Sequence, residues 1–285
     1  MKSRLITNLL LAVLLITLGL VAWLKSGQEN EEQTRVTSLD ISAIDSIVIE
    51  HRNSENISLN LINQKWKITK PFNAPALSGK IAHLLKISQI APPVIYPLVP
   101  SLLTQFGLAK PVARISFNGE TLSIGGIETI NSRRYVTSNE QLFLLDDTFL
   151  HHLTAQPNAY IDTRLLPDNT QIVELQTPQI HLKRNQENIW ATVSQTPLEL
   201  SSDAVQMLLD EWRFARAIHV NYQPKQDTGQ VVTITLANNQ KINFKFIQQE
   251  DDAILMSTGS QLAYTFSREK YKKMNTLPKL DNSDA

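Results

Sequence analysis

The chain has 285 residues, with 27 Lys and Arg against 27 Asp and Glu, so its formal net charge is zero. A chain without a global basic field is a poor candidate for binding nucleic acid. It has no cysteine, which excludes disulfides, thiolate metal ligands and a thiol nucleophile. Its 42% hydrophobic share is enough for a folded core, and its length predicts one or two domains.

The chain opens with an apolar segment. Leu5 to Leu24 is a run of 20 residues without a charge, which as a helix would span about 30 Å, the thickness of the bilayer core. Lys2 and Arg4 precede the run and predict a cytoplasmic N-terminus. We therefore predict that residues 1–25 are a cytoplasmic tip and a single signal-anchor in the inner membrane, with the bulk of the chain periplasmic or extracytoplasmic. A cleaved signal peptide is the alternative, but its apolar core would be shorter and would end in a small-residue cleavage site.

Residues 26–43 are predicted to form a polar spacer, after which alternating apolar residues indicate half-buried strands. The first three strands are expected at residues 46–51, 57–62 and 65–69. Ser78 is a candidate cap for the helix that follows, whose apolar face holds Ile81, Leu84 and Leu85. After a proline-rich passage, four more short strands are expected at residues 113–117, 121–124, 134–137 and 141–145.

Two short helices are predicted between these elements. One covers Ser101–Phe106 and ends at Gly107 in the left-handed conformation that glycine tolerates best. The other begins at Asp146 or Asp147 and runs to residue 153.

The same succession of elements returns later in the chain. Trp66 and Trp190 are 124 residues apart, and so are Ser78 and Ser202 and three apolar helix positions. Further on the spacing is 120 residues, which pairs Gln141-Leu142 with Gln261-Leu262 and Asp147 with Ser267. Because both tryptophans face the apolar rows of their helices, we expect each to anchor a core.

The repeat predicts an α+β protein made of two tandem copies of a β-rich unit with packed helices, carried on one transmembrane helix. The first copy is expected at residues 44–156 and the second at 171–276. Residues 157–170 connect them, and 277–285 form a flexible tail.

Several motifs of the first copy point to a family. They are Trp66 followed by Pro71 and a leucine-rich helix, Phe106-Gly107-Leu108-Ala109-Lys110-Pro111, Leu122-Ser123-Ile124-Gly125, and Arg134-Tyr135-Val136. In this order they resemble the bacterial family known as domain of unknown function 4340, best over residues 44–166. The resemblance implies a membrane-anchored extracytoplasmic protein of unassigned activity. Several members accompany ABC transporters similar to the gliding-motility type.

Side chains that often carry chemistry form no catalytic or metal-binding motif here. The six histidines, at positions 51, 83, 151, 152, 181 and 219, lack metal-ligand spacing. Asp146-Asp147 and Glu250-Asp251-Asp252 are interpreted as a helix cap and a solvated turn, and Gly125-Gly126 as a turn. Arg133-Arg134 forms one basic patch, and Arg268, Lys270, Lys272 and Lys273 form another. Both patches are interpreted as solvated faces, with contact to lipid headgroups or an anionic glycan as the alternative.

We therefore predict no catalytic, cofactor-binding or metal-binding residues. The leading functional expectation is a non-catalytic accessory subunit of an envelope assembly, with a membrane-protein partner and an ABC transporter of the gliding-motility type as its candidate. One alternative is a binding module for an envelope glycan or lipid. Another is an enzyme whose residues converge only in three dimensions.

Overall fold

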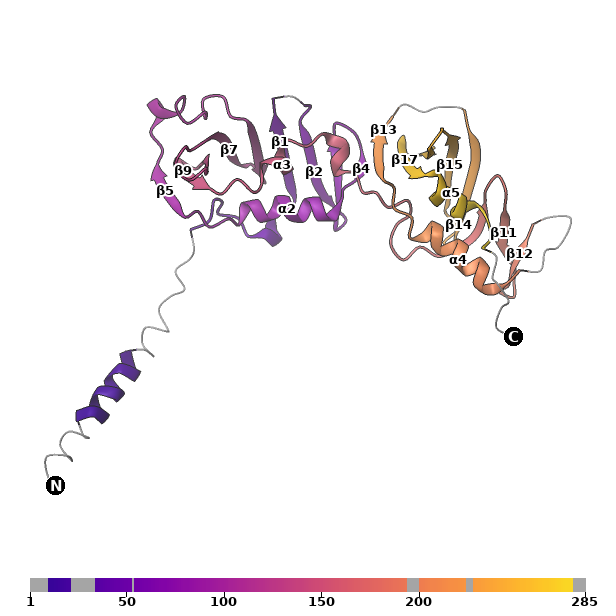
Figure 1. Ribbon diagram of the computed structural model, residues 1–285, viewed down its shortest axis with the longest axis horizontal. Helices are drawn as coiled ribbons and strands as arrows, with labels where there is room; N and C mark the ends of the chain where they lie inside the picture. The colour runs from indigo at the N-terminus through magenta and orange to yellow at the C-terminus, as the bar shows by residue number, and fades with distance from the viewer. Residues whose placement is uncertain (1–9, 22–33, 53, 194–199, 224–227, 279–285) are drawn as a thin grey trace, which may run out of the picture.

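The computed structural model describes residues 10–21, 34–52, 54–193, 200–223 and 228–278 (Figure 1). Residues 10–21 form a helix in which every residue is exposed. Within the described ranges, no helix is both long enough and apolar enough to cross a membrane. Residues 5–9 and 22–24 of the predicted anchor, residues 26–33 of the predicted spacer and the tail from 279 onward lie outside these ranges. The rest of the predicted spacer packs on the first sheet, since Val36 is buried in the core and its N–H bonds the carbonyl oxygen of Ile90.

The first half of the described chain forms an antiparallel sheet of nine strands in the order β4-β3-β2-β1-β6-β7-β8-β9-β5. Ile47 and Ile49 of the inner strand β1 are fully buried, as expected for alternating side chains over a core. The strands are β1 (Ser46–His51), β2 (Ile57–Ile62), β3 (Lys65–Lys70), β4 (Ala74–Pro75), β5 (Val94–Pro97), β6 (Ala113–Phe117), β7 (Glu120–Ile127), β8 (Arg134–Ser138) and β9 (Gln141–Leu145). The helices are α2 (Ser78–Ser88) and α3 (Leu150–Leu153), with 3-10 turns η1 (Ile41–Ala43), η2 (Pro100–Leu102) and η3 (Pro157–Tyr160).

The second half forms an antiparallel sheet in which the described residues supply eight strands, in the order β12-β11-β10-β14-β15-β16-β17-β13. The strands are β10 (Ile172–Gln176), β11 (His181–Arg184), β12 (Trp190–Thr192), β13 (His219–Tyr222), β14 (Gln230–Leu236), β15 (Lys241–Gln248), β16 (Asp252–Ser257) and β17 (Leu262–Ser267). Its helices are α4 (Ser202–Arg213) and α5 (Arg268–Asn275). The protein is thus an α+β fold with two antiparallel sheets and few helices.

The two sheets have the same strand order once the short strand β4 is set aside. In each, the helix after the third strand leads to an edge strand that pairs with the last strand of the sheet. The buried faces of the helices also correspond at the predicted spacing of 124: Ile81 and Leu84 in α2 match Val205 and Leu208 in α4. Each helix therefore packs on its sheet through residues at equivalent positions of the sequence.

The last strands correspond at a spacing of 121 residues, and the predicted spacing of 120 is wrong. Phe143 of β9 and Tyr264 of β17 both belong to the core, as do the residues two positions further on. Since side chains alternate between the faces of a strand, an error of one residue would place these side chains on opposite faces. Ser267 therefore corresponds to Asp146, and its predicted pairing with Asp147 is incorrect.

The tryptophans of the repeat contact the core without being enclosed by it. Trp66 and Trp190 are half-buried, because β3 and β12 lie at or next to the ends of their sheets. The fully buried tryptophan is Trp212 of α4, whose indole Nε1 donates a hydrogen bond to the carbonyl oxygen of Met274. In α2 the matching position is Ser88, which is too small for the same role.

Two of the predicted helix caps are wrong. Ser78 is the first residue of α2, and the preceding Leu77 is held in an extended conformation by a hydrogen bond from its N–H to the carbonyl oxygen of Tyr160. α3 begins only at Leu150, and neither Asp146 nor Asp147 caps it. Ser267 does cap α5, because its hydroxyl accepts a hydrogen bond from the N–H of Lys270.

The glycines of the first sheet mark a close crossing of backbones. Gly107 has a φ of +68°, as predicted, although it follows the short turn η2 rather than a helix over residues 101–106. Gly125 and Gly126, predicted as a turn, lie inside β7 at a register irregularity. The carbonyl oxygen of Phe106 would be 2.5 Å from a Cβ at Gly125, and it accepts a hydrogen bond of 2.8 Å from the N–H of Gly126. Only a residue without a side chain permits this approach.

The two sheets meet at β13 of the second (Figure 1), where Asn158 of η3 donates its Nδ2 to Oδ1 of Asn221. Phe72 and Tyr222 stack across the junction with ring centroids 4.8 Å apart. The connecting segment pairs with the residues before β13, through a 3.0 Å hydrogen bond from the N–H of Leu165 to the carbonyl oxygen of Ala215. These contacts cover the edge of β13 that β17 leaves open.

Candidate functional site

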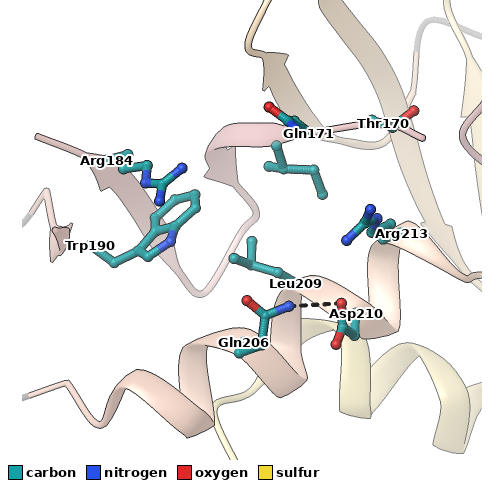
Figure 2. Close-up of a pocket in the computed structure, with 9 residues that line it drawn as sticks. Thr170, Gln171, Arg184, Trp190, Gln206, Leu209, Asp210 and Arg213 are labelled. Carbon is teal, nitrogen blue, oxygen red and sulfur yellow. Dashed lines mark hydrogen bonds between the residues drawn. The ribbon is translucent and has the colours of Figure 1, made fainter. Parts of the chain in front are cut away.

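A groove of about 250 Å³ lies between α4 and the outer strands of the second sheet (Figure 2). Its walls combine one aromatic side chain with several polar ones. The lining residues are Thr170, Gln171, Ile172, Arg184, Trp190, Gln206, Leu209, Asp210 and Arg213.

The strand pair β11–β12 faces helix α4 across the groove. Trp190 of β12 lies directly opposite Arg184 of β11, and the two side chains form one wall in Figure 2. On the other side, Gln206 and Asp210 stand one turn apart on α4 and are joined by a 2.9 Å hydrogen bond. The guanidinium of Arg184 is held in place because its Nε donates to the carbonyl oxygen of Asn188 at 3.0 Å.

These side chains suit a flat, hydroxyl-rich ligand that carries a negative charge. The half-buried indole of Trp190 offers an open face for stacking. Arg184 and Arg213 supply guanidinium donors for a carboxylate or phosphate, and Asp210 is the one acidic residue among the described residues that line the groove. Amides and a hydroxyl around an aromatic face are typical of sites that orient a small polar ligand.

The first sheet does not reproduce this polar set. Trp66 lies opposite Leu61 instead of an arginine. At the spacing of 124 residues, Gln206 and Asp210 correspond to Ala82 and Lys86 of α2. The groove is therefore a feature of the second sheet.

Three of the six histidines come together, which their positions in the sequence did not predict. His83 of α2 stacks on His152 of α3 at 4.6 Å, and His151 lies 3.9 Å from His152, between ring centroids. Burial, together with the nearby His151, Lys80 and His83, lowers the pKa of His152 to about 4. Among the described residues, no group of three or more histidines, aspartates or glutamates could hold a metal ion.

The other histidines are spread over both sheets. His181 of β11 lies with its Nε2 2.9 Å from an oxygen of Glu174, and this hydrogen bond lowers the pKa of the Glu174 carboxyl. His51 ends β1 and His219 begins β13. The structure brings none of these three to the groove.

Arg134 is not part of a solvated basic patch, contrary to the prediction. It is 5% exposed, its Nη1 donates to the carbonyl oxygen of Gly125 at 2.7 Å, and it forms an ion pair with Asp147. Arg133 is half-buried and pairs at 3.2 Å with the exposed Asp146. The difference follows from where β8 begins, because Arg134 is its first residue and faces the core while Arg133 lies just before the strand.

The remaining charged motifs lie on the surface of the second sheet. Glu250 and Asp251 are exposed in the turn between β15 and β16, as expected for a solvated turn, whereas Asp252 is half-buried and begins β16. On α5, Lys270 pairs with Glu211 of α4, and Lys273 pairs with Glu269 at 3.1 Å. These pairs tie α5 to α4 and to itself.

Comparison with protein families gives one match. The family described as Domain of unknown function (DUF4340) matches residues 66–230, which is 165 of the 285 residues. The chain belongs to this family. The match begins at Trp66 and ends where β14 begins, so it includes the connection, the groove residues and α4 as well as most of the first sheet. Searches of curated proteins and of solved structures give no significant match.

Sequence reasoning did not find the groove. Gln206, Asp210 and Arg213 follow the spacing of an exposed helix face, which most amphipathic helices share. Arg184 lies in β11, whose sequence contains no recognisable binding motif. The one available signal was Trp190, whose position at a sheet edge leaves part of the indole open.

Proposed function

We propose that the protein is a non-catalytic, membrane-anchored accessory subunit of an envelope assembly. In this proposal residues 5–24 cross the inner membrane once, the N-terminus lies in the cytoplasm, and both sheets lie outside the cytoplasm. The partner is a membrane protein, and the family resemblance makes an ABC transporter of the gliding-motility type its first candidate.

What supports a binding role is the distribution of reactive and apolar side chains. Arg134 forms an ion pair within the first sheet, and Glu174 accepts a hydrogen bond within the second. Lys270 forms an ion pair that joins α5 to α4. Large apolar side chains are meanwhile exposed on the surface, among them Tyr96 at 50% and Ile130 at 83%. Surfaces of this kind serve recognition better than reaction, because a reaction needs polar groups held close together in a dry cleft.

Purification of the full chain in mild detergent tests the proposal. We expect integral membrane proteins, identified by mass spectrometry, to accompany the full chain and to be lost when Leu5–Leu24 is replaced by a cleavable signal. Normal cellular function of that soluble version would overturn the membrane-subunit proposal.

The groove supports a second candidate function, binding of an acidic envelope glycan. Its stacking face at Trp190 and its guanidinium groups at Arg184 and Arg213 are the reason. We expect oligosaccharides that contain a carboxylated sugar to bind the full chain in titration calorimetry, and Trp190→Ala to abolish this binding.

Trp66→Ala is the matched control for this glycan experiment. Trp66 takes the corresponding place in the first sheet and is also half-buried, but no arginine lies opposite it. Binding that survives in Trp190→Ala, or that is lost equally in Trp66→Ala, would contradict a site in the groove.

We also propose that the two sheets are copies of one duplicated unit, close to residues 44–156 and 171–276. The support is the common strand order and the matching helix faces of α2 and α4. An experimental structure in which the two halves superpose along their whole sheets would establish the duplication, and a different path of the backbone would contradict it.

A further inference from the structure

Six exposed apolar side chains lie around the outer end of the first sheet, and we call them the apolar corner. Ile130 is 83% exposed, and the others are between 37% and 55% exposed. They are Ile95, Tyr96, Val99, Leu102, Ile127 and Ile130.

Backbone contacts hold the parts of the apolar corner together. Ile95 and Tyr96 belong to β5, the free edge strand drawn at the left end of the first sheet in Figure 1. The segment after β5 carries Val99 and Leu102 and returns to β7, where the carbonyl oxygen of Phe106 accepts the N–H of Gly126. Ile127 and Ile130 follow directly on this crossing. The two segments that carry the apolar corner thus meet at this crossing. Ile95 and Tyr96 are neighbours on β5 and lie on opposite faces of its edge.

The β5 segment of the apolar corner carries no charge. Between Lys86 and Lys110 the sequence contains no charged side chain. At the β7–β8 turn, the carboxylate of Glu128 accepts the N–H of Asn131. Pro97 removes a backbone donor from the free edge of β5, which disfavours pairing with a further strand.

The way each sheet is joined to the chain before it shows what lies next to this edge. The N–H of Val36 bonds the carbonyl oxygen of Ile90 at 3.0 Å, shortly before β5. In the same way, the N–H of Leu165 donates to the carbonyl oxygen of Ala215 shortly before β13. The chain therefore enters each sheet next to an edge strand, β5 in the first sheet and β13 in the second.

At β13 the preceding part of the chain covers the edge, because the first sheet contacts it through Phe72 and Asn158. At β5 the preceding part of the chain is the segment that contains the uncharged run 5–24. Residues 25–33, which separate that run from the described residue 34, can span at most about 30 Å. Whatever surrounds residues 5–24 is therefore within reach of β5.

We propose that the apolar corner rests in the lipid–water interface of the membrane that holds residues 5–24. Apolar side chains gain from leaving water there, and the amphipathic ring of Tyr96 suits the headgroup region. No ionic group in the stretch between Lys86 and Lys110 opposes the insertion. The inference rests on the proposed membrane anchoring and adds that the first sheet itself lies on the bilayer.

Site-specific fluorescence tests the proposal, because the chain has no cysteine of its own. The variants Tyr96→Cys and Ile130→Cys are labelled with an environment-sensitive dye in the full chain, reconstituted into nanodiscs of phosphatidylethanolamine and phosphatidylglycerol. We expect blue-shifted emission and strong quenching by spin-labelled lipid at both positions. The control is Val231→Cys, since Val231 is 60% exposed but lies in the second sheet, and its label should stay water-exposed and unquenched.

The outcomes separate the two proposals. Chain that elutes apart from the nanodiscs would contradict the anchoring itself. If the chain stays with the nanodiscs but its labels at 96 and 130 behave like the label at 231, the anchoring stands. The proposal that the apolar corner contacts lipid would then be wrong. Labels that become shielded without lipid quenching, and only at several chains per nanodisc, would overturn it in favour of a contact between copies.

Discussion

The two sheets of this protein share one strand order and differ in what their edges meet. Val220 of β13 is 3% exposed, and the first sheet covers that edge. Ile95, which takes the place of Val220 in β5, is 39% exposed. The same framework therefore makes an internal junction in one half and an open apolar surface in the other, and the chain that precedes each sheet decides which.

The halves also differ in how their helices are fixed. α4 places Trp212 in the core and against α5, whereas α2 has Ser88 at that position. The first sheet instead uses the buried Arg134 and the glycine crossing at β7. Equivalent frameworks have thus been stabilised by different contacts, and substitutions can measure each one.

The largest expected effect is at Trp212. Trp212→Ala removes a fully buried indole and its hydrogen bond, and should lower the free energy of unfolding by about 3–5 kcal/mol. Trp66→Ala and Trp190→Ala should each cost only about 1–3 kcal/mol, because these indoles are half-buried. Urea unfolding followed by circular dichroism measures the three values, and equal losses would show that the three sites are equally buried.

The next effect concerns the buried guanidinium of the first sheet. Arg134→Ala leaves Asp147 without its partner and should cost about 3 kcal/mol of stability. Arg133→Ala, which removes the neighbouring exposed pair with Asp146, should cost less than about 1 kcal/mol. A loss at Arg133 as large as at Arg134 in the same unfolding assay would contradict the burial described here.

The glycine crossing is a further feature of the first half, because β15 has Lys245 at the position of Gly125. Gly125→Ala places a Cβ 2.5 Å from the carbonyl oxygen of Phe106 and should destabilise by about 1–3 kcal/mol. Gly259→Ala is the control, since nothing lies within 4 Å of a Cβ there. Thermal unfolding should show a lower midpoint for the first variant alone.

The smallest expected effect is a pH dependence that arises at the stacked histidines of the first half, since α5 has lysines where α3 has His151 and His152. The pKa of His152 is about 4 in the folded chain and near 6.5 when unfolded. Between these values the unfolded state binds more protons, so stability falls as the pH drops from 6.5 to 4. The variant His152→Gln should lose less stability over this range than the unchanged chain, and identical pH profiles for both would contradict the shift.

Much of the fold could be predicted because a half-buried strand shows which of its residues are buried through the alternation of apolar and polar residues along the chain. The strands β1, β2, β6 and β9 begin and end where the alternation of apolar residues predicts, and the helices α2 and α4 carry their buried residues at the predicted spacing. The errors occurred where a neighbour overrides the local signal. Leu77 replaces Ser78 before α2 because Tyr160 holds it, and Gly125 lies inside a strand because Phe106 crosses it.

The amino-acid sequence alone determined the two-fold succession of strands and helices, the apolar run at Leu5–Leu24 and the membership in the family, because these depend on residue order and period. Only the tertiary structure decided that Trp190 borders a groove with Arg184 and Asp210, and that β13 is covered while β5 is open. Such contacts join residues far apart in the chain. No local pattern encodes them, because their energy arises only once the sheets are packed.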